Sequence, residues 1–200
     1  MSTQILWFAT RGAGIVSLIL FSVVACLGLL AVARAQSTWW PRFLTVEVHR
    51  SLALLSVAFL AVHILTAVLD PFTHLGLAAA VLPLASSYRP VQVALGVVSV
   101  YFAAAMIITS LLRDRLGHRA WRTVHWLAYA AWPLAVAHSI TAGSDGIAVW
   151  MLAVTGLCVF AVGAALFYRL EAGRTNRSRL PAVAAGTAAP IPAEPAWRND

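Results

Sequence analysis

The chain has 200 residues, of which 61% are hydrophobic and only 10% are charged, and its mean hydropathy is +0.83. Soluble domains are about half apolar and about a quarter charged, so this composition excludes an ordinary soluble domain and predicts an integral membrane protein. The net charge is +7 and all fourteen basic residues are arginines. No long charge run or basic polar face indicates a nucleic-acid partner.

Five apolar runs are long enough to cross a bilayer, which takes about 20 helical residues. They cover about residues 12–33, 48–69, 92–112, 122–142 and 147–168. Turn-forming stretches separate them, such as Asp70-Pro71 after the second run and residues 143–146 before the last. The expected fold is therefore an all-α integral membrane bundle of five transmembrane helices.

The first run ends at Ala33-Arg34-Ala35, which resembles a signal-peptidase site. However, the run is longer than the apolar region of a signal peptide, about 7–15 residues. Cleavage there would also place Arg42 and Arg50 outside and invert the later loops. We therefore expect the first run to remain as a transmembrane helix.

The arginines outside the apolar runs predict the orientation. With five spans, Arg11 and Arg89 lie on the face of the amino terminus, and twelve arginines lie on the opposite face. These twelve are Arg34, Arg42, Arg50, Arg113, Arg115, Arg119, Arg122, Arg169, Arg174, Arg177, Arg179 and Arg198. Because cytoplasmic loops carry the excess of arginine, the amino terminus is expected outside and the carboxyl terminus in the cytoplasm. A multi-pass protein of the plasma membrane is the expected localisation.

The expected domain organisation is simple. Residues 1–170 form one transmembrane domain, and residues 171–200, rich in Ala and Pro after Arg179, form a disordered cytoplasmic tail. No glycine-rich loop after a strand could bind FAD or a nicotinamide nucleotide. Cys26 and Cys158 lie in apolar runs without a metal-binding spacing, and are expected to be small buried hydrophobic residues.

Four of the six histidines fall in two of the apolar runs. His49 and His63 lie in the second run, and His125 and His138 lie in the fourth, whereas His74 and His118 are expected in loops. One intramembrane histidine could simply bond to a neighbouring helix. Four such ionisable residues, in two pairs with spacings of fourteen and thirteen residues, indicate a functional role.

The two runs point the same way through the membrane, so His49 and His125 share the cytoplasmic level and His63 and His138 share the outer level. A rise of 1.5 Å per residue separates the levels by about 20 Å. Neutral imidazoles from two facing helices can ligate a haem iron from both sides, and two levels would hold two haems. Zinc is less suited, because no nearby Cys or carboxylate completes a tetrahedron.

The azimuths of the two pairs differ. Fourteen residues at about 100° each come within about 40° of whole turns, but thirteen residues miss by about 140°. Pro133 lies between His125 and His138, and a proline kinks or retwists a helix. We expect Pro133 to correct the misfit.

The sequence resembles the ferric reductase-like transmembrane domain, the haem-bearing membrane part of ferric reductases, NADPH oxidases and the haem subunit of the methionine sulfoxide reductase system. The resemblance covers about residues 5–168. It is carried by HRSLALLSVAFLAVH at 49–63, HWLAYAAWPLAVAH at 125–138, the TSLLRDRLGHRAWRTVH run at 109–125, and Trp7 with Arg11-Gly12 near the amino terminus.

The resemblance implies an inner b-type haem held by His49 and His125 and an outer one held by His63 and His138. It also implies the haem-containing membrane subunit of an oxidoreductase, with no catalytic residue of its own. Electrons would pass from a cytosolic flavin reductase, with flavin on that separate partner, or from quinol. The acceptor would be an extracytoplasmic protein or a small oxidant.

The resemblance also suggests roles for residues near the haems. Arg11 would pair with an outer-haem propionate, although an interfacial arginine is an equal alternative. Arg50 and Arg122 could neutralise inner-haem propionates, or serve only as positive-inside signals. Three aromatic residues could line the haems, but packing is the favoured interpretation for them; they are Trp126, Tyr129 and Trp132.

Two other classes of function remain open from the sequence. A small transporter or proton pathway could use the histidines as relays, although no Asp or Glu lies in the middle of a span. A structural membrane subunit without redox chemistry would tolerate loss of the histidines.

Overall fold

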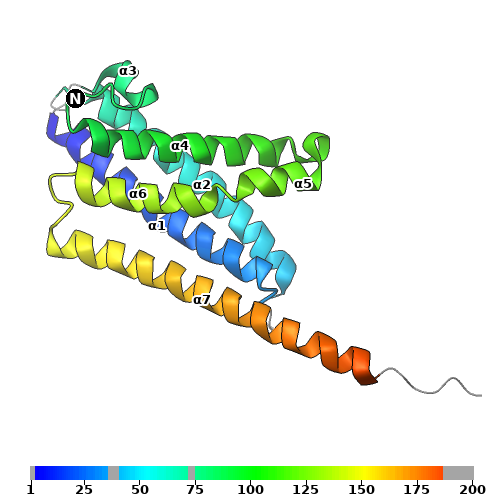
Figure 1. Ribbon diagram of the computed structural model, residues 1–200. Coiled ribbons are helices and arrows are strands. Elements are labelled where there is room, and N and C mark those ends of the chain that lie inside the picture. The colour runs from blue at the N-terminus through cyan, green and yellow to red at the C-terminus, as the bar shows by residue number, and fades with distance from the viewer. Residues whose placement is uncertain (1–2, 36–40, 72–74, 187–200) are drawn as a thin grey trace, which may run out of the picture.

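The computed structural model describes residues 3–35, 41–71 and 75–186. Within these ranges every secondary-structure element is a helix (Figure 1). The helices are α1 (Thr3–Val32), α2 (Arg42–Leu69), α3 (Gly76–Val81), α4 (Pro90–Leu111), α5 (Arg113–His125), α6 (Ala128–Ala142) and α7 (Val149–Gly186). The expected all-α fold is confirmed. His74 lies outside the described residues.

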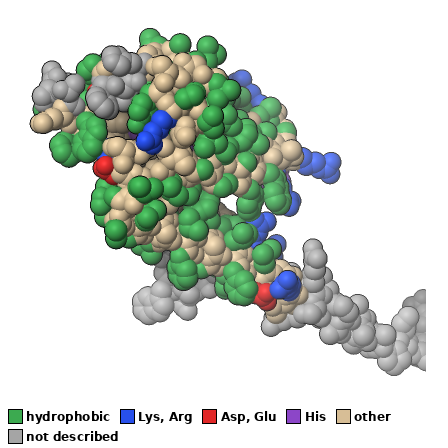
Figure 2. Space-filling model, turned by 60° about the vertical axis from the view of Figure 1, so that its left-hand side comes forward, with side chains coloured by type: hydrophobic (Ala, Val, Ile, Leu, Met, Phe, Trp, Pro, Cys, Tyr) green, Lys and Arg blue, Asp and Glu red, His purple; other side chains and the backbone are tan. Residues whose placement is uncertain are grey.

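Four helices of the described chain are long and apolar enough to cross a membrane. They are Gln4–Val32, Phe43–Leu69, Pro90–Leu111 and Val149–Thr175. They coincide with four of the five expected spans, so a multi-pass membrane protein is confirmed. Large apolar side chains remain exposed on the bundle, as Phe160 does at 74%, and Figure 2 shows hydrophobic side chains spread over the face in view. Such a surface fits lipid.

The remaining expected span, 122–142, is divided between the end of α5 and α6. At 15 residues, α6 alone is shorter than the roughly 20 residues that a span takes. The chain does not turn away at the division, since α5 and α6 follow one another beside α4 (Figure 1). Four N–H groups there bond to carbonyls three residues earlier, at 2.9–3.3 Å; they belong to Trp126, Leu127, Tyr129 and Ala130. The division is therefore a short 3₁₀ stretch.

This 3₁₀ stretch changes the azimuth of His138 relative to His125. A 3₁₀ turn advances about 120° per residue instead of about 100°. About five such residues add about 100°, which reduces the expected misfit of about 140° to about 40°. The extra twist thus lies before Pro133, and it gives this pair the same offset as His49 and His63.

The helices pack as two hairpins, α1 with α2 and α4 with α6, which meet through α1 and α6. Helix α7 packs mainly on α1 and runs along the outside of the bundle (Figure 1). Serine hydroxyls join each hairpin. Ser17 and Ser56 donate to each other's carbonyls at 3.4 and 3.3 Å, and Ser99 donates to the carbonyl of Ala131 at 2.8 Å. Small and hydroxylated residues are the usual contacts between helices in lipid.

Helix α7 continues to Gly186 and so includes residues that the sequence assigned to the tail. Residues 187–200 lie outside the described residues, and the division into a transmembrane domain and a disordered tail stays a prediction. The loop at 36–40 is likewise outside the described ranges.

Candidate functional site

The four histidines that the sequence predicts in the membrane lie in two facing pairs, at opposite ends of the bundle. The rings of His63 on α2 and His138 on α6 have centroids 6.2 Å apart and are nearly perpendicular, at 83°. The rings of His49 on α2 and His125 at the end of α5 have centroids 6.4 Å apart at 55°. The antiparallel hairpins thus bring together residues that are 75 and 76 positions apart in the sequence.

Three of these imidazoles bond to a backbone carbonyl of the partner helix in their hairpin. Nδ1 of His63 lies 2.8 Å from the carbonyl of Thr10, and Nδ1 of His49 lies 3.0 Å from that of Val24. Nδ1 of His138 lies 2.8 Å from the carbonyl of Gln92. A carbonyl oxygen only accepts, so Nδ1 carries the proton in each ring. In a neutral imidazole the lone pair is then on Nε2, which is available for a metal.

A glycine follows each accepting carbonyl by four residues. A Cβ on Gly14 would lie 2.8 Å from Nδ1 of His63, and a Cβ on Gly96 would lie 2.7 Å from Nδ1 of His138. A Cβ on Gly28 would lie 3.4 Å from Cε1 of His49. The imidazoles therefore occupy space that a side chain would fill at Gly14 and Gly96.

His125 is held differently. Its Nδ1 is buried and has no hydrogen-bond partner among the described residues. Its ring stacks on Trp121, with centroids 5.0 Å apart at 31°. The indole of Trp121 donates to the hydroxyl of Ser110 at 3.0 Å, and it also contacts His118, whose ring centroid is 5.3 Å away. An aromatic stack thus orients the fourth histidine in place of a carbonyl.

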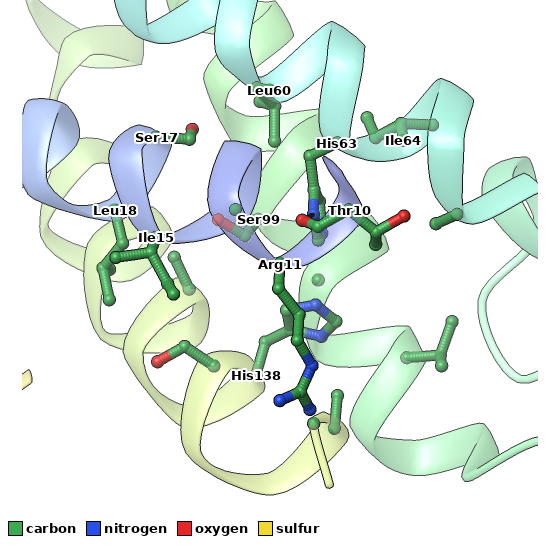
Figure 3. A pocket seen from close by; sticks show the side chains of 18 of the residues that line it. Thr10, Arg11, Ile15, Ser17, Leu18, Leu60, His63, Ile64, Ser99 and His138 are labelled. Atoms are coloured by element: carbon green, nitrogen blue, oxygen red, sulfur yellow. Dashed lines mark hydrogen bonds between the residues drawn. The ribbon is translucent and has the colours of Figure 1, made fainter. Parts of the chain in front are cut away.

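A cavity of about 330 Å³ surrounds the outer pair. His63, His138 and Arg11 point into it from three different helices (Figure 3). Most of its lining is apolar, and a few polar groups lie among the lining residues, including Asp70, Tyr88 and Asp145. An apolar cavity with few convergent polar groups is the usual form of a cofactor site.

Arg11 reaches the mouth of this cavity and ties it to the loop between α6 and α7. Its guanidinium forms an ion pair with Asp145, donates to the hydroxyl of Ser144 at 2.8 Å, and lies 4.3 Å from the ring centre of Trp7. A second arginine, Arg89, donates to the carbonyl of Thr141 at 2.6 Å on the same side. Arg11 and Arg89, the two arginines expected outside the membrane, thus both lie at the end of the bundle that holds His63 and His138.

The other arginine candidates flank the inner pair. Arg50 follows His49 directly and Arg122 precedes His125 by three residues, and both side chains are exposed. Of the aromatic candidates, Trp132 donates to the hydroxyl of Ser22 at 2.9 Å. Trp126 and Tyr129 stack on each other 5.2 Å apart and lie beside Arg169. Trp126 and Tyr129 are 52% and 43% exposed, and the preference for packing over a place beside a haem stays a prediction for all three.

The donor set fits a metal held between two imidazoles. Two metal–nitrogen bonds of about 2 Å, plus about 1 Å from each ring centre to its nitrogen, span about 6 Å, close to the separations of both pairs. In the described ranges no three His, Cys, Asp or Glu side chains come together as a metal site. A haem brings ring nitrogens of its own to its iron, so two histidines at each level would be enough to hold it.

Sequence reasoning missed Gly14, Gly28, Gly96 and Trp121. One signal was available: Gly14 and Gly28 are fourteen residues apart, the same spacing as His49 and His63. Glycine is frequent in transmembrane helices, so that spacing alone does not show which glycines face a histidine.

A comparison with known families gives one match. The family model described as "Ferric reductase like transmembrane component" matches residues 13–136. The matched range includes His49, His63 and His125 and ends two residues before His138. No curated protein and no solved structure shows a significant match.

Proposed function

Because the chain belongs to the ferric reductase-like transmembrane family, a family of membrane electron-transfer components, we propose that it carries electrons across the membrane through two b-type haems. The inner haem would lie between His49 and His125, and the outer haem between His63 and His138. The single observation that carries this proposal is the geometry of the two pairs, whose ring centroids are 6.4 and 6.2 Å apart.

The chain's own residues prepare both sites. The carbonyls of Thr10, Val24 and Gln92 hold the proton on Nδ1 of three histidines and leave the lone pair on Nε2. A bound haem supplies one-electron exchange between ferric and ferrous iron. The two histidine pairs lie about 20 Å apart along the helices. An electron would therefore cross the membrane in short steps from one haem to the next.

The polarity of the bundle supports the direction from cytoplasm to exterior. Arg11 and Arg89 lie at the outer pair, whereas α5 at the inner pair carries Arg113, Arg115, Arg119 and Arg122. By the positive-inside rule the amino terminus would lie outside and the carboxyl terminus in the cytoplasm. Helices α5 and α6 together would form a fifth span of a plasma-membrane protein. Electrons would enter near His49 from a cytosolic flavoprotein or quinol, and leave near His63 to an extracytoplasmic acceptor.

Charged groups near each pair would hold the haem propionates. Arg11 is the candidate at the outer haem, since its guanidinium already pairs with the carboxylate of Asp145 at the cavity mouth. Arg50 and Arg122 are the candidates at the inner haem, because each is exposed and adjacent to a ligand histidine.

An optical spectrum of the detergent-solubilised protein tests the proposal. We expect two haems per chain and a reduced α-band typical of bis-histidine haem. His63→Ala combined with His138→Ala should remove half of the haem, because no other ligand remains at the outer level. Leu65→Ala is the control on α2, because this side chain two residues after His63 is 59% exposed, and it should keep both haems. A colourless protein, or an unchanged haem content in the double variant, would contradict the proposal.

A further inference from the structure

Three of the four histidines meet the same local structure on a neighbouring helix: a backbone carbonyl and a glycine four residues later. We propose that Gly14, Gly28 and Gly96 are positioning residues that open these carbonyls to the imidazoles and thereby fix the direction of each ligating Nε2. This inference rests on the proposed function and deepens it, because it assigns how the ligands are aimed.

The geometry of a helix explains why glycine is needed. The carbonyl of residue i accepts the N–H of residue i+4, and the side chain of residue i+4 lies beside that carbonyl. When residue i+4 is glycine, a ring from another helix can reach the second lone pair of the carbonyl oxygen. The carbonyls of Thr10, Val24 and Gln92 each lie four residues before such a glycine.

The three positions differ in how closely the ring approaches. At Gly14 and Gly96 an added Cβ would come within 2.8 and 2.7 Å of Nδ1, so the imidazole would have to move. At Gly28 the nearest ring atom would be 3.4 Å away, which is close to an ordinary contact. An alanine at Gly14 or Gly96 would therefore displace the imidazole, whereas an alanine at Gly28 would leave His49 nearly in place.

The fourth histidine shows what happens without a glycine. Thirteen and fourteen residues after Gly96, helix α4 has Thr109 and Ser110, whose hydroxyls donate to the carbonyls of Ala105 and Met106 at 2.8 and 2.7 Å. Those carbonyls already have a side-chain partner, and Nδ1 of His125 remains unbonded. The outer level thus has two carbonyl-oriented ligands and the inner level has one.

A hydrogen bond from Nδ1 makes the imidazole a stronger and better-oriented ligand, and loss of such a partner commonly weakens metal binding by about 10- to 100-fold. Gly14→Ala and Gly96→Ala should therefore release the outer haem about 10- to 100-fold more readily, while the inner haem stays in place. Gly28→Ala should change the inner haem much less. Gly12→Ala is the matched control on α1, because nothing lies within 4 Å of its added Cβ.

The experiment measures haem dissociation from each full-length variant, by transfer to an excess of apo-globin, and the low-spin ferric EPR spectrum, which responds to imidazole orientation and hydrogen bonding. The retained inner haem shows in the same sample that the bundle is folded. Selective loss or an altered EPR signal of the outer haem in both Gly14→Ala and Gly96→Ala supports the inference.

Two results overturn it: both variants behave like Gly12→Ala, or they lose both haems together. Failure of the broader proposal looks different, because the unmodified protein would then contain no haem at all.

Discussion

At the scale of single residues, the inner and outer pairs are not equivalent, and the difference lies in His125. Its ring is oriented by stacking on Trp121, which in turn is fixed by a hydrogen bond to Ser110. An aromatic contact of this kind contributes about 0.5–1.5 kcal/mol, or about two- to tenfold in affinity. Retention of the proposed inner haem would therefore depend on one aromatic side chain that contacts His125.

We expect Trp121→Leu to weaken retention of the inner haem by about two- to tenfold, because the stack on His125 is lost. Trp121→Phe keeps a ring and loses only the indole N–H, so it should lie close to the unmodified protein. Haem dissociation rates measured separately for the two levels check this. Equal effects of Leu and Phe would show that the hydrogen bond to Ser110, and not the stack, orients His125.

Arg11 forms an ion pair with Asp145 and is proposed to hold a propionate of the outer haem. Two substitutions distinguish these two roles. Arg11 is 19% exposed and Asp145 35% exposed, so breaking their ion pair should cost on the order of 1 kcal/mol in stability. Asp145→Asn should lower the melting temperature, and Arg11→Gln should lower it further, because Arg11→Gln also removes the contacts with Ser144 and Trp7. Only Arg11→Gln should also weaken the outer haem, by about tenfold, if the guanidinium holds a propionate. Equal haem retention in both variants would remove Arg11 from the haem site.

At the scale of elements, the 3₁₀ stretch before Pro133 aligns the two histidines of the fourth expected span. Its i to i−3 bonds lie between Thr123 and Ala130, and they supply the additional twist that an ideal α-helix lacks. The proline follows that stretch, and we expect the twist to persist without it.

Deleting Ala128 should rotate His138 by about 100° relative to His125 and so abolish the outer haem while the inner haem remains. Pro133→Ala is the control, and we expect it to keep both haems, since the 3₁₀ bonds lie upstream of it. The haem-to-protein ratio from the optical spectrum provides the measurement. Loss of the outer haem in Pro133→Ala would restore the proline to the role that the sequence alone suggested.

The alignment of His125 with His138 shows where sequence reasoning ends. The pairing of the four histidines followed from two spacings and from the direction of two helices, because both depend only on helix periodicity. The 3₁₀ stretch did not follow, since Trp126, Leu127 and Ala128 have no breaker among them and the tightening depends on tertiary contacts. The glycines were equally hidden, because Gly12 and Gly14 look alike until the position of His63 is known.

At the scale of the whole molecule, the arrangement of arginines gives the bundle a polarity that can be tested directly. After Cys26 and Cys158 are changed to Ser, we introduce Ala148→Cys beside the outer pair or Arg115→Cys beside the inner pair. A membrane-impermeant maleimide should label Ala148→Cys in intact cells. It should label Arg115→Cys only after the membrane is opened. The reverse pattern would invert the proposed direction of electron flow.

The serine contacts of the two hairpins have a consequence for how the protein tolerates different membranes. Ser56 lies seven residues from both His49 and His63, and Ala131 lies between His125 and His138 at six and seven residues. Hydrogen bonds thus join the two helices of each hairpin midway between the histidine levels, between Ser17 and Ser56 and between Ser99 and Ala131. A helix cannot slide along its neighbour without breaking these serine hydrogen bonds. Thinner or thicker bilayers should therefore tilt the bundle as one body and leave the distance between the two histidine pairs constant.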